Sequence, residues 1–395
     1  MSERQPADRT YESRGVSADK RDVKNALRFT DPGLFPGAFC KVVPDVLAGS
    51  GDHCVLLHAD GAGTKSALAY IHYRRYGDPH VFAGIAQDSL VMNLDDLLCV
   101  GCTGPFLLSN TIGRNAKLIP GEVVAEIIRG YQQVADDLRQ YDISIVPCGG
   151  ETADVGDLVR TVVVDATLAA RMRRDDVIDC SRVRPGHVIV GLASFGRAAW
   201  EPAENSGIGT NGFTAARHEL LAAKFRAEFP ETFAPDIFDL AYRGRFDLDD
   251  PLPHSAMTIG EALLSPTRTY APVVREVLTA CRTQISALFH NTGGGQTKCL
   301  GFGRNVRYVK NNLFPLPPIF RFLREVTGLP LSEMSRVFNL GHRLEIVCDP
   351  SASQSVIAIA QRAAIAAQVI GVVEPAESGR SLVLQADGET VEFQA

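Results

Sequence analysis

The residues from Asp60 to Lys65 combine an acid, two glycines and a lysine in the order Asp-Gly-Ala-Gly-Thr-Lys. Free backbone amides at Gly61 and Gly63 could approach a phosphate. The helix expected to follow would direct its N-terminal dipole to the same place. The spacing differs from the Walker pattern, in which lysine directly follows the second glycine, because Thr64 intervenes here. The segment is therefore either a phosphate-binding loop of another kind or a structural turn between strand and helix.

Six acids in the first half of the chain could supply oxygen ligands to a magnesium ion: Asp60, Asp88, Asp95, Asp96, Glu151 and Asp154. Magnesium is usually held by one or two carboxylates together with substrate phosphates. Helical periodicity over 88–101 places Asp88, Asp95 and Asp96 on a polar face. For Asp95 and Asp96, a solvated helix face is the simpler explanation. Asp60 differs, because an acid between an apolar strand and a Gly-x-Gly turn is an unusual place for a solvated charge.

A second unusual loop, His-Asn-Thr-Gly-Gly-Gly, covers 290–295. Three consecutive glycines permit close approach of the backbone to a ligand. His290 could donate to a phosphate or take part in proton transfer. The alternative is a structural histidine with satisfied hydrogen bonds.

The elements that must position these loops follow from periodicity and from turn residues. Strands are predicted at 54–58, 81–86, 106–109, 143–147, 159–171 and 343–349. Helices are predicted at 64–77, 88–101, 121–141, 213–226, 258–264, 270–281 and 353–368. Residues 229–254 are irregular. We predict a mobile N-terminal arm (1–40), a first domain (41–184) and a second domain (185–385).

Composition excludes several classes of protein. The net charge is −6 and no run of Lys or Arg occurs, which argues against a nucleic-acid partner. Nine cysteines, an odd number in a long chain, argue against a disulfide scaffold. Cys99 and Cys102 form an isolated C-x-x-C, so we expect both to be buried as small apolar residues. No apolar run approaches the ~20 residues of a membrane span. With no apolar leader segment at its start, the protein is expected to be cytoplasmic.

Seven segments, in this order, resemble the aminoimidazole ribonucleotide synthetase (phosphoribosylformylglycinamidine cyclo-ligase) family. They are DGAGTKS (60–66), GIAQDSLVMNLDDLL (84–98), GGETAD (149–154), NSGIGTNGFTAAR (205–217), GEALLSPTRTY (260–270), HNTGGGQTK (290–298) and SRVFNLGHRLEI (335–346). The resemblance extends from about Tyr11 to Glu374. The first and third segments also occur across a wider superfamily of ATP-using enzymes.

This resemblance implies an α+β fold of two domains and a homodimer in which strands of both N-terminal domains form a shared β-barrel. It implies a ligase of purine biosynthesis that uses ATP and Mg2+. The substrate would be formylglycinamidine ribonucleotide, which is closed to aminoimidazole ribonucleotide with release of ADP and phosphate. The ATP site would lie beside the dimer interface, and neither nucleic acid nor membrane would be a partner.

The resemblance also assigns residues. The catalytic set would be His290, Lys65 and Asp96. The nucleotide set would be Asp60, Gly61, Gly63, Thr64, Lys65, Asp88, Glu151 and Thr152. The substrate set would be Asn211, Gly212, His290, Thr292, Gly293, Gly294 and Gly295. The metal ligands would be Asp60, Asp96 and Glu151.

The chain departs from the family at several points. The glycine-rich stretch usually found before the first strand is reduced here to residues 31–42. An acid that is common in the family is replaced by Asn110. Residues 197–209 and 229–254 are longer than the matching segments of compact family members. The pair Cys40-Lys41 resembles part of a loop of selenophosphate synthetase, so phosphoryl transfer of that kind is the alternative enzymatic function. The alternative without enzymatic activity is a non-catalytic paralogue that binds a nucleotide.

Overall fold

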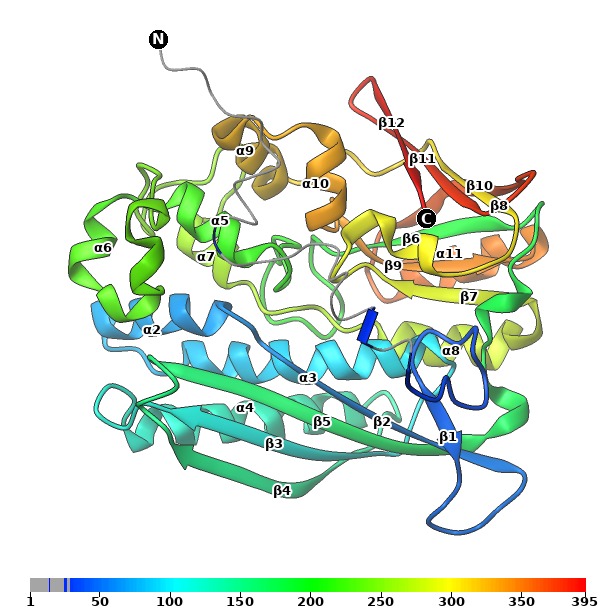
Figure 1. Ribbon diagram of the computed structural model, residues 1–395, viewed down its shortest axis with the longest axis horizontal. Helices are drawn as coiled ribbons and strands as arrows, with labels where there is room; N and C mark the ends of the chain where they lie inside the picture. Colours follow the sequence, from blue (N-terminus) through cyan, green and yellow to red (C-terminus); the bar gives the residue numbers. More distant parts are fainter. Residues whose placement is uncertain (1–13, 15–24, 27–28) are drawn as a thin grey trace.

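In the computed structural model, the described part of the chain comprises Arg14, Asn25, Ala26 and 29–395. Most of the predicted N-terminal arm lies outside these residues. The first half contains β1 (Val42–Pro44), β2 (His53–Gly61), α2 (Lys65–Tyr76), α3 (Val81–Cys99), β3 (Phe106–Arg114), α4 (Gly121–Arg139), β4 (Ile145–Asp154) and β5 (Val162–Arg173). These elements form the lower layers in Figure 1.

The second half contains β6 (Val188–Ala193), α5 (Phe213–Leu220), α6 (Lys224–Glu228), α7 (Ile259–Leu264), α8 (Ala271–Cys281), β7 (Ile285–His290), β8 (Val306–Lys310), α9 (Pro318–Thr327), α10 (Leu331–Val337), β9 (His342–Cys348), α11 (Ser353–Arg362), β10 (Ala367–Pro375), β11 (Arg380–Ala386) and β12 (Glu389–Gln394). The α+β class predicted from the sequence is confirmed. The second sheet continues to Gln394, beyond residue 385.

The first sheet has five strands in the order β1-β2-β5-β3-β4, with only β3 and β4 parallel. Even-numbered residues of β5 are buried from Val162 to Met172, and its odd-numbered residues are more exposed. This alternation defines an inner face, which packs on α3 and α4, and an outer face. No helix covers the outer face in the described part of the chain (Figure 1).

The predicted strand at 81–86 is wrong, because this segment is the first turn and a half of α3. Helix α3 lies between the inner face of the first sheet and the second half of the chain (Figure 1). Because α3 is buried on both sides, its first residues are apolar on every side of the helix. Hydrophobic periodicity therefore cannot distinguish this segment from a buried strand. Gly84 marks the close approach, since a Cβ there would lie 3.1 Å from Pro266 Cγ.

The strand predicted at 143–147 continues further than expected, because the Gly-Gly-Glu-Thr-Ala-Asp segment (149–154) forms the second half of β4. It pairs in parallel with β3, where Asn110 faces Gly150 after a shift of register at Leu108. Glycines in a sequence usually indicate a turn. Here a Cβ at Gly150 would lie 2.3 Å from the backbone oxygen of Asn110, so glycine allows the strands to approach.

The second sheet has seven strands in the order β12-β11-β8-β10-β6-β9-β7. Helices α8 and α11 pack together, and α11 contacts β6 and β10. The predicted helix at 213–226 is broken into α5 and α6. The predicted helix at 353–368 ends at Arg362, because Ala364 is left-handed and Ala367 begins β10.

Other expectations about local structure are confirmed. Helix α2 ends at Gly77, which adopts the left-handed C-cap conformation. Residues 229–254 contain short 3-10 helices and isolated β-bridges but no α-helix or β-strand. Cys99 and Cys102 are buried, and burial raises the pKa of the Cys102 thiol to about 11. Within 29–395, no helix has the length and apolar character that crossing a bilayer requires.

Candidate active site

The carboxylate of Asp96 lies between two histidines from different parts of the fold. His290 Nδ1, at the end of β7, is 2.6 Å from Asp96 Oδ1. His58 Nε2, on the inner face of β2, is 3.1 Å from Asp96 Oδ2. Burial alone would raise the pKa of Asp96, but the hydrogen bonds from His290 and His58 hold it below its usual range. Asp96 is therefore an ionised acceptor with both oxygens engaged.

The proton positions on His58 follow from its neighbours. The amide nitrogen of Asn93 donates to the backbone oxygens of Asp60, Ser89 and Ala166, so Asn93 Oδ1 must face His58 Nδ1. His58 then donates from Nδ1 to this amide oxygen and from Nε2 to Asp96. Burial lowers the pKa of His58, but these hydrogen bonds outweigh it and raise the pKa above its ordinary value.

Sequence reasoning missed His58. Its position two residues before Asp60 on the same strand places both side chains on one face, and that spacing was the available signal. Nothing in the sequence shows that α3 brings Asp96 to the same point.

Lys65 lies in a different environment from the open, phosphate-facing position that was expected. Its side chain is fully buried, with Nζ 3.1 Å from Asp88 Oδ1 and bonded to the backbone oxygen of Ser265. Burial lowers the pKa of Lys65 and raises that of Asp88, and their contact opposes both shifts. In this arrangement Lys65 and Asp88 join the two halves of the chain.

The solvated helix face expected for Asp95 and Asp96 is wrong. Asp88 and Asp95 are fully buried, because the polar face of α3 is covered by the second half of the chain. Asp95 accepts hydrogen bonds from Thr269 Oγ1 (2.8 Å) and Arg343 Nη2 (3.2 Å). Periodicity identifies the polar face correctly but cannot show what covers it.

The expected magnesium ligands are not gathered at one point of a single chain. Glu151 pairs with Thr111, which pairs with Asp165, which pairs with Gly61. Three strand spacings correspond to about 14 Å. Glu151 is on the outer face, whereas Asp60 is on the inner face beside His58. Within the described residues, no group of three or more His, Cys, Asp or Glu side chains could hold a metal ion.

The Asp-Gly-Ala-Gly-Thr-Lys segment links the end of β2 to the start of α2. Gly63 has a left-handed φ of 57°, and a Cβ there would meet no atom within 4 Å, so this side of the loop is open. Thr64 Oγ1 lies 2.8 Å from Thr214 Oγ1 of α5. The predicted nucleotide loop therefore contacts the helix that follows the predicted substrate residues.

The predicted substrate residues come together. A Cβ at Gly293 would lie 3.7 Å from Asn211 Nδ2. Gly295 has a φ of 49°, and a Cβ there would lie 2.5 Å from the backbone oxygen of Ser335, so only glycine fits. Thr292 precedes these glycines and Gly294 lies between them on the same loop, and Gly212 immediately precedes α5.

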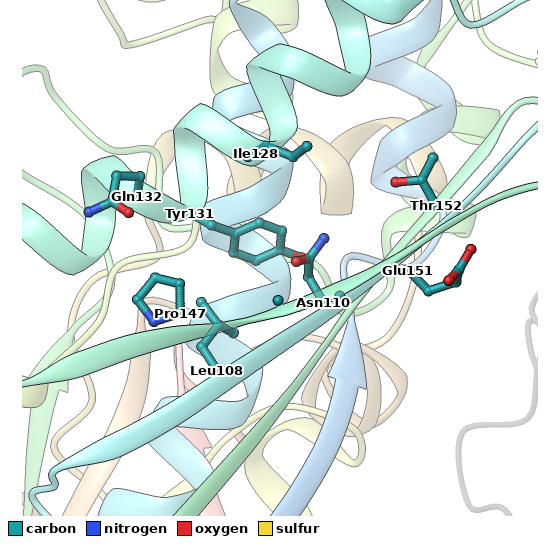
Figure 2. A pocket seen from close by; sticks show the side chains of 10 residues that line it. Leu108, Asn110, Ile128, Tyr131, Gln132, Pro147, Glu151 and Thr152 are labelled. Carbon is teal, nitrogen blue, oxygen red and sulfur yellow. The ribbon is translucent and has the colours of Figure 1, made fainter.

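A cavity of about 260 Å3 lies between α4 and the inner face of strands β3 and β4. It is lined by Leu108, Asn110, Ile128, Tyr131, Gln132, Pro147, Gly149, Gly150, Glu151 and Thr152. Figure 2 shows Tyr131 reaching from α4 toward Asn110 and the strand that carries Thr152. The lining combines apolar surface with amide and hydroxyl groups, a composition typical of small-molecule sites.

Comparison with known proteins gives two family matches. The AIR synthase related protein N-terminal domain matches residues 40–172, and the C-terminal domain matches residues 184–383. The phosphoribosylformylglycinamidine cyclo-ligase of Methanocaldococcus jannaschii is 30% identical, covering 81% of this chain and 78% of its own. The enzyme of that name from Pseudothermotoga lettingae is 29% identical, covering 94% and 98%.

Solved structures support the fold alone. A chain of the HypE–HypF complex has a TM-score of 0.57 and 12% identity, covering 95% of this chain and 99% of that one. Thermotoga maritima PurL complexed with FGAR has a TM-score of 0.55 and 15% identity. That match covers 96% of this chain and half of PurL.

Proposed function

Because the chain belongs to the AIR synthase related family, we propose that it is an ATP-dependent ligase that closes formylglycinamidine ribonucleotide to aminoimidazole ribonucleotide. The observation that carries the proposal is the convergence of Asp96, His290 and the 290–295 loop beside the Asp60–Lys65 segment. The names of the curated relatives supply the substrate.

The proposed reaction has two steps. The amide oxygen of the substrate attacks the γ-phosphate of ATP as the amide nitrogen loses its proton, which gives an iminophosphate and ADP. The amidine nitrogen then attacks the iminophosphate carbon, the C–O bond breaks, and phosphate leaves as the nitrogen loses a proton. Positioning and charge neutralisation account for most of the catalysis in such phosphoryl transfers.

We propose that His290 transfers a proton during the reaction. Because ionised Asp96 can only accept, His290 Nδ1 donates to it. The opposite nitrogen, Nε2, is buried 4.0 Å from Asp95 Oδ2 and has no hydrogen-bond partner within the described residues. That fixed imidazole is suited to exchange a proton with substrate. Asp96 orients the His290 ring through this hydrogen bond.

The nucleotide would meet the open side of the loop at Gly63, where the amides at the start of α2 can approach phosphate oxygens. Asp60 fits a magnesium ligand, since its exposed carboxylate accepts only from the amide of Gly61 among the described residues. Magnesium would neutralise phosphate charge, and it commonly uses only one or two protein carboxylates. We propose Asp60 and Asp96 as the magnesium ligands on this side of the sheet. The cavity beside Thr152 would receive part of the nucleotide.

The first test is direct. Purified protein with formylglycinamidine ribonucleotide, ATP and magnesium is expected to yield aminoimidazole ribonucleotide and ADP in equal amounts. Selenide replaces the ribonucleotide in a parallel reaction. Turnover with selenide alone would favour the selenophosphate synthetase alternative. Nucleotide binding without turnover of either substrate would favour a non-catalytic paralogue.

We further propose that the protein is a homodimer joined through the outer face of the first sheet. An apolar row crosses four neighbouring strands of this face in register, formed by Leu57, Ala169, Leu107 and Val146. The exposed fractions of Leu57 and Leu107 are 68% and 51%. An exposed apolar face of this kind commonly marks a protein–protein interface. It supports the shared barrel implied by the family resemblance.

Replacing Leu57 with aspartate is expected to convert the dimer to a monomer, because the change places a charge in the middle of the apolar row. Sedimentation velocity measures the oligomeric state. Leu158→Asp is the matched control, since Leu158 is 85% exposed in the turn between β4 and β5. A Leu57→Asp protein that sediments as a dimer, like the control, would contradict the proposed interface.

A further inference from the structure

A second cavity, of about 330 Å3, lies at the other end of β7 from His290. It opens where β6 and β7 begin and β9 ends. Its lining consists of Arg182, Arg184, His187, Thr283, Gln284, Ile285, Ser286 and Asp349. None of these residues belongs to the candidate active site, and the volume is at the lower end of the range for small-molecule pockets.

The floor of the cavity is a fixed chain of hydrogen bonds. Arg184 Nε, which can only donate, lies 3.0 Å from His187 Nε2, so His187 Nε2 carries no proton. His187 Nδ1 therefore donates to Ser286 Oγ (3.0 Å), whose own hydroxyl donates to the backbone oxygen of Val347 (3.0 Å). His187 is only 5% exposed, and burial together with the charge of Arg184 lowers its pKa. The imidazole is thus a neutral, buried acceptor.

These hydrogen bonds hold the guanidinium of Arg184 in one position and leave its Nη atoms able to bind an anion. Its Nε is held by His187, while neither Nη atom has a hydrogen bond or ion pair among the described residues. Arg182 likewise has no such partner within 29–395. Asp349 brings the one negative charge of the lining, and its Oδ1 accepts from the amide and hydroxyl of Ser351. The lining therefore carries one net positive charge.

We propose that this cavity binds the phosphate group of a small molecule. The paired Nη atoms of an arginine match two phosphate oxygens, and a guanidinium already fixed at Nε loses less conformational freedom on binding. Arg182 adds a second positive charge, and the hydroxyl of Thr283 adds a neutral hydrogen-bonding group to the same lining. The source is either inorganic phosphate or a phosphate monoester.

Calorimetric titration distinguishes these sources, with inorganic phosphate and ribose 5-phosphate as separate probes of the full chain. Arg184→Gln is expected to weaken binding at least tenfold, about the worth of one charged hydrogen-bonded contact. Arg304→Gln, the same change at an exposed arginine outside the cavity, is expected to bind as the wild type does. If both probes bind, the phosphate group alone is sufficient for binding. If only ribose 5-phosphate binds, the ligand of the cavity is a phosphate monoester.

Two results would overturn the proposal. One is absence of binding of either probe at millimolar concentration. The other is equal affinity in the wild type and Arg184→Gln, which would place the phosphate elsewhere, including the candidate active site. Arg182→Gln gives an independent second variant, expected to weaken binding by a smaller factor because this side chain is not held by His187. The readout is binding, so the result does not depend on the proposed ligase activity.

Discussion

Asp96→Asn is expected to lower turnover by about a hundred- to a thousandfold while leaving the fold and the oligomeric state intact. The carboxylate accepts one hydrogen bond from His290 and one from His58. An asparagine has a single acceptor oxygen, so its NH2 group would face one imidazole as a second donor. The loss corresponds to removal of one electrostatic contact that stabilises a transition state.

Steady-state kinetics over a range of magnesium concentrations measures the effect, and we also expect the variant to require more magnesium. Asp157→Asn is the matched control, because Asp157 is exposed in the turn after β4. Circular dichroism and sedimentation check the fold and the oligomeric state. A folded Asp96→Asn protein with turnover near that of the control would remove Asp96 from the catalytic machinery.

Glu345→Gln is expected to reduce the free energy of unfolding by about 3–5 kcal/mol at neutral pH, the cost of leaving one partner of a buried ion pair alone. Glu345 Oε1 accepts from Lys310 Nζ (2.5 Å), Asn291 Nδ2 (2.7 Å) and His342 Nε2 (3.1 Å). All four side chains are buried. The variant leaves the Lys310 ammonium without a counter-charge and weakens the support beneath the 290–295 loop.

The pH dependence follows from the same contacts. Burial alone would raise the pKa of Glu345, but Lys310 and His342 lower it to about 2 from 4.5. A depressed folded-state pKa stabilises the protein above pH 4.5, and this contribution is lost as the pH falls toward 2. The stability difference between wild type and Glu345→Gln should therefore shrink over that window.

Urea unfolding at pH 7 and at several acidic values measures this difference. Glu392→Gln is the control, because Glu392 pairs with Arg307 at the surface, where such pairs contribute at most about 1 kcal/mol. A loss in Glu345→Gln no larger than in Glu392→Gln would show that the buried network does not stabilise the fold.

Structural features that depend on residues adjacent in the sequence were predictable from the sequence. Helix α4 and the C-cap at Gly77 follow from periodicity and from the left-handed preference of glycine. The order of the motifs also indicated the family that the family models match. The same local rules failed at 81–86 and 149–154, where a doubly buried helix and a glycine-containing strand imitate other elements.

The sequence by itself determined the α+β class, the candidate acids and loops, and the two faces of each regular element. Only the tertiary structure decided which partner covers each face. The polar side of α3 looked like a solvated surface, yet the second half of the chain buries it. Asp88 pairs with Lys65 of α2, and Asp96 pairs with His290 of the second half. These partners are 23 and 194 residues apart in the chain. Periodicity reports the direction of a side chain around its own helix, whereas burial and pairing depend on contacts that form only when distant segments pack together.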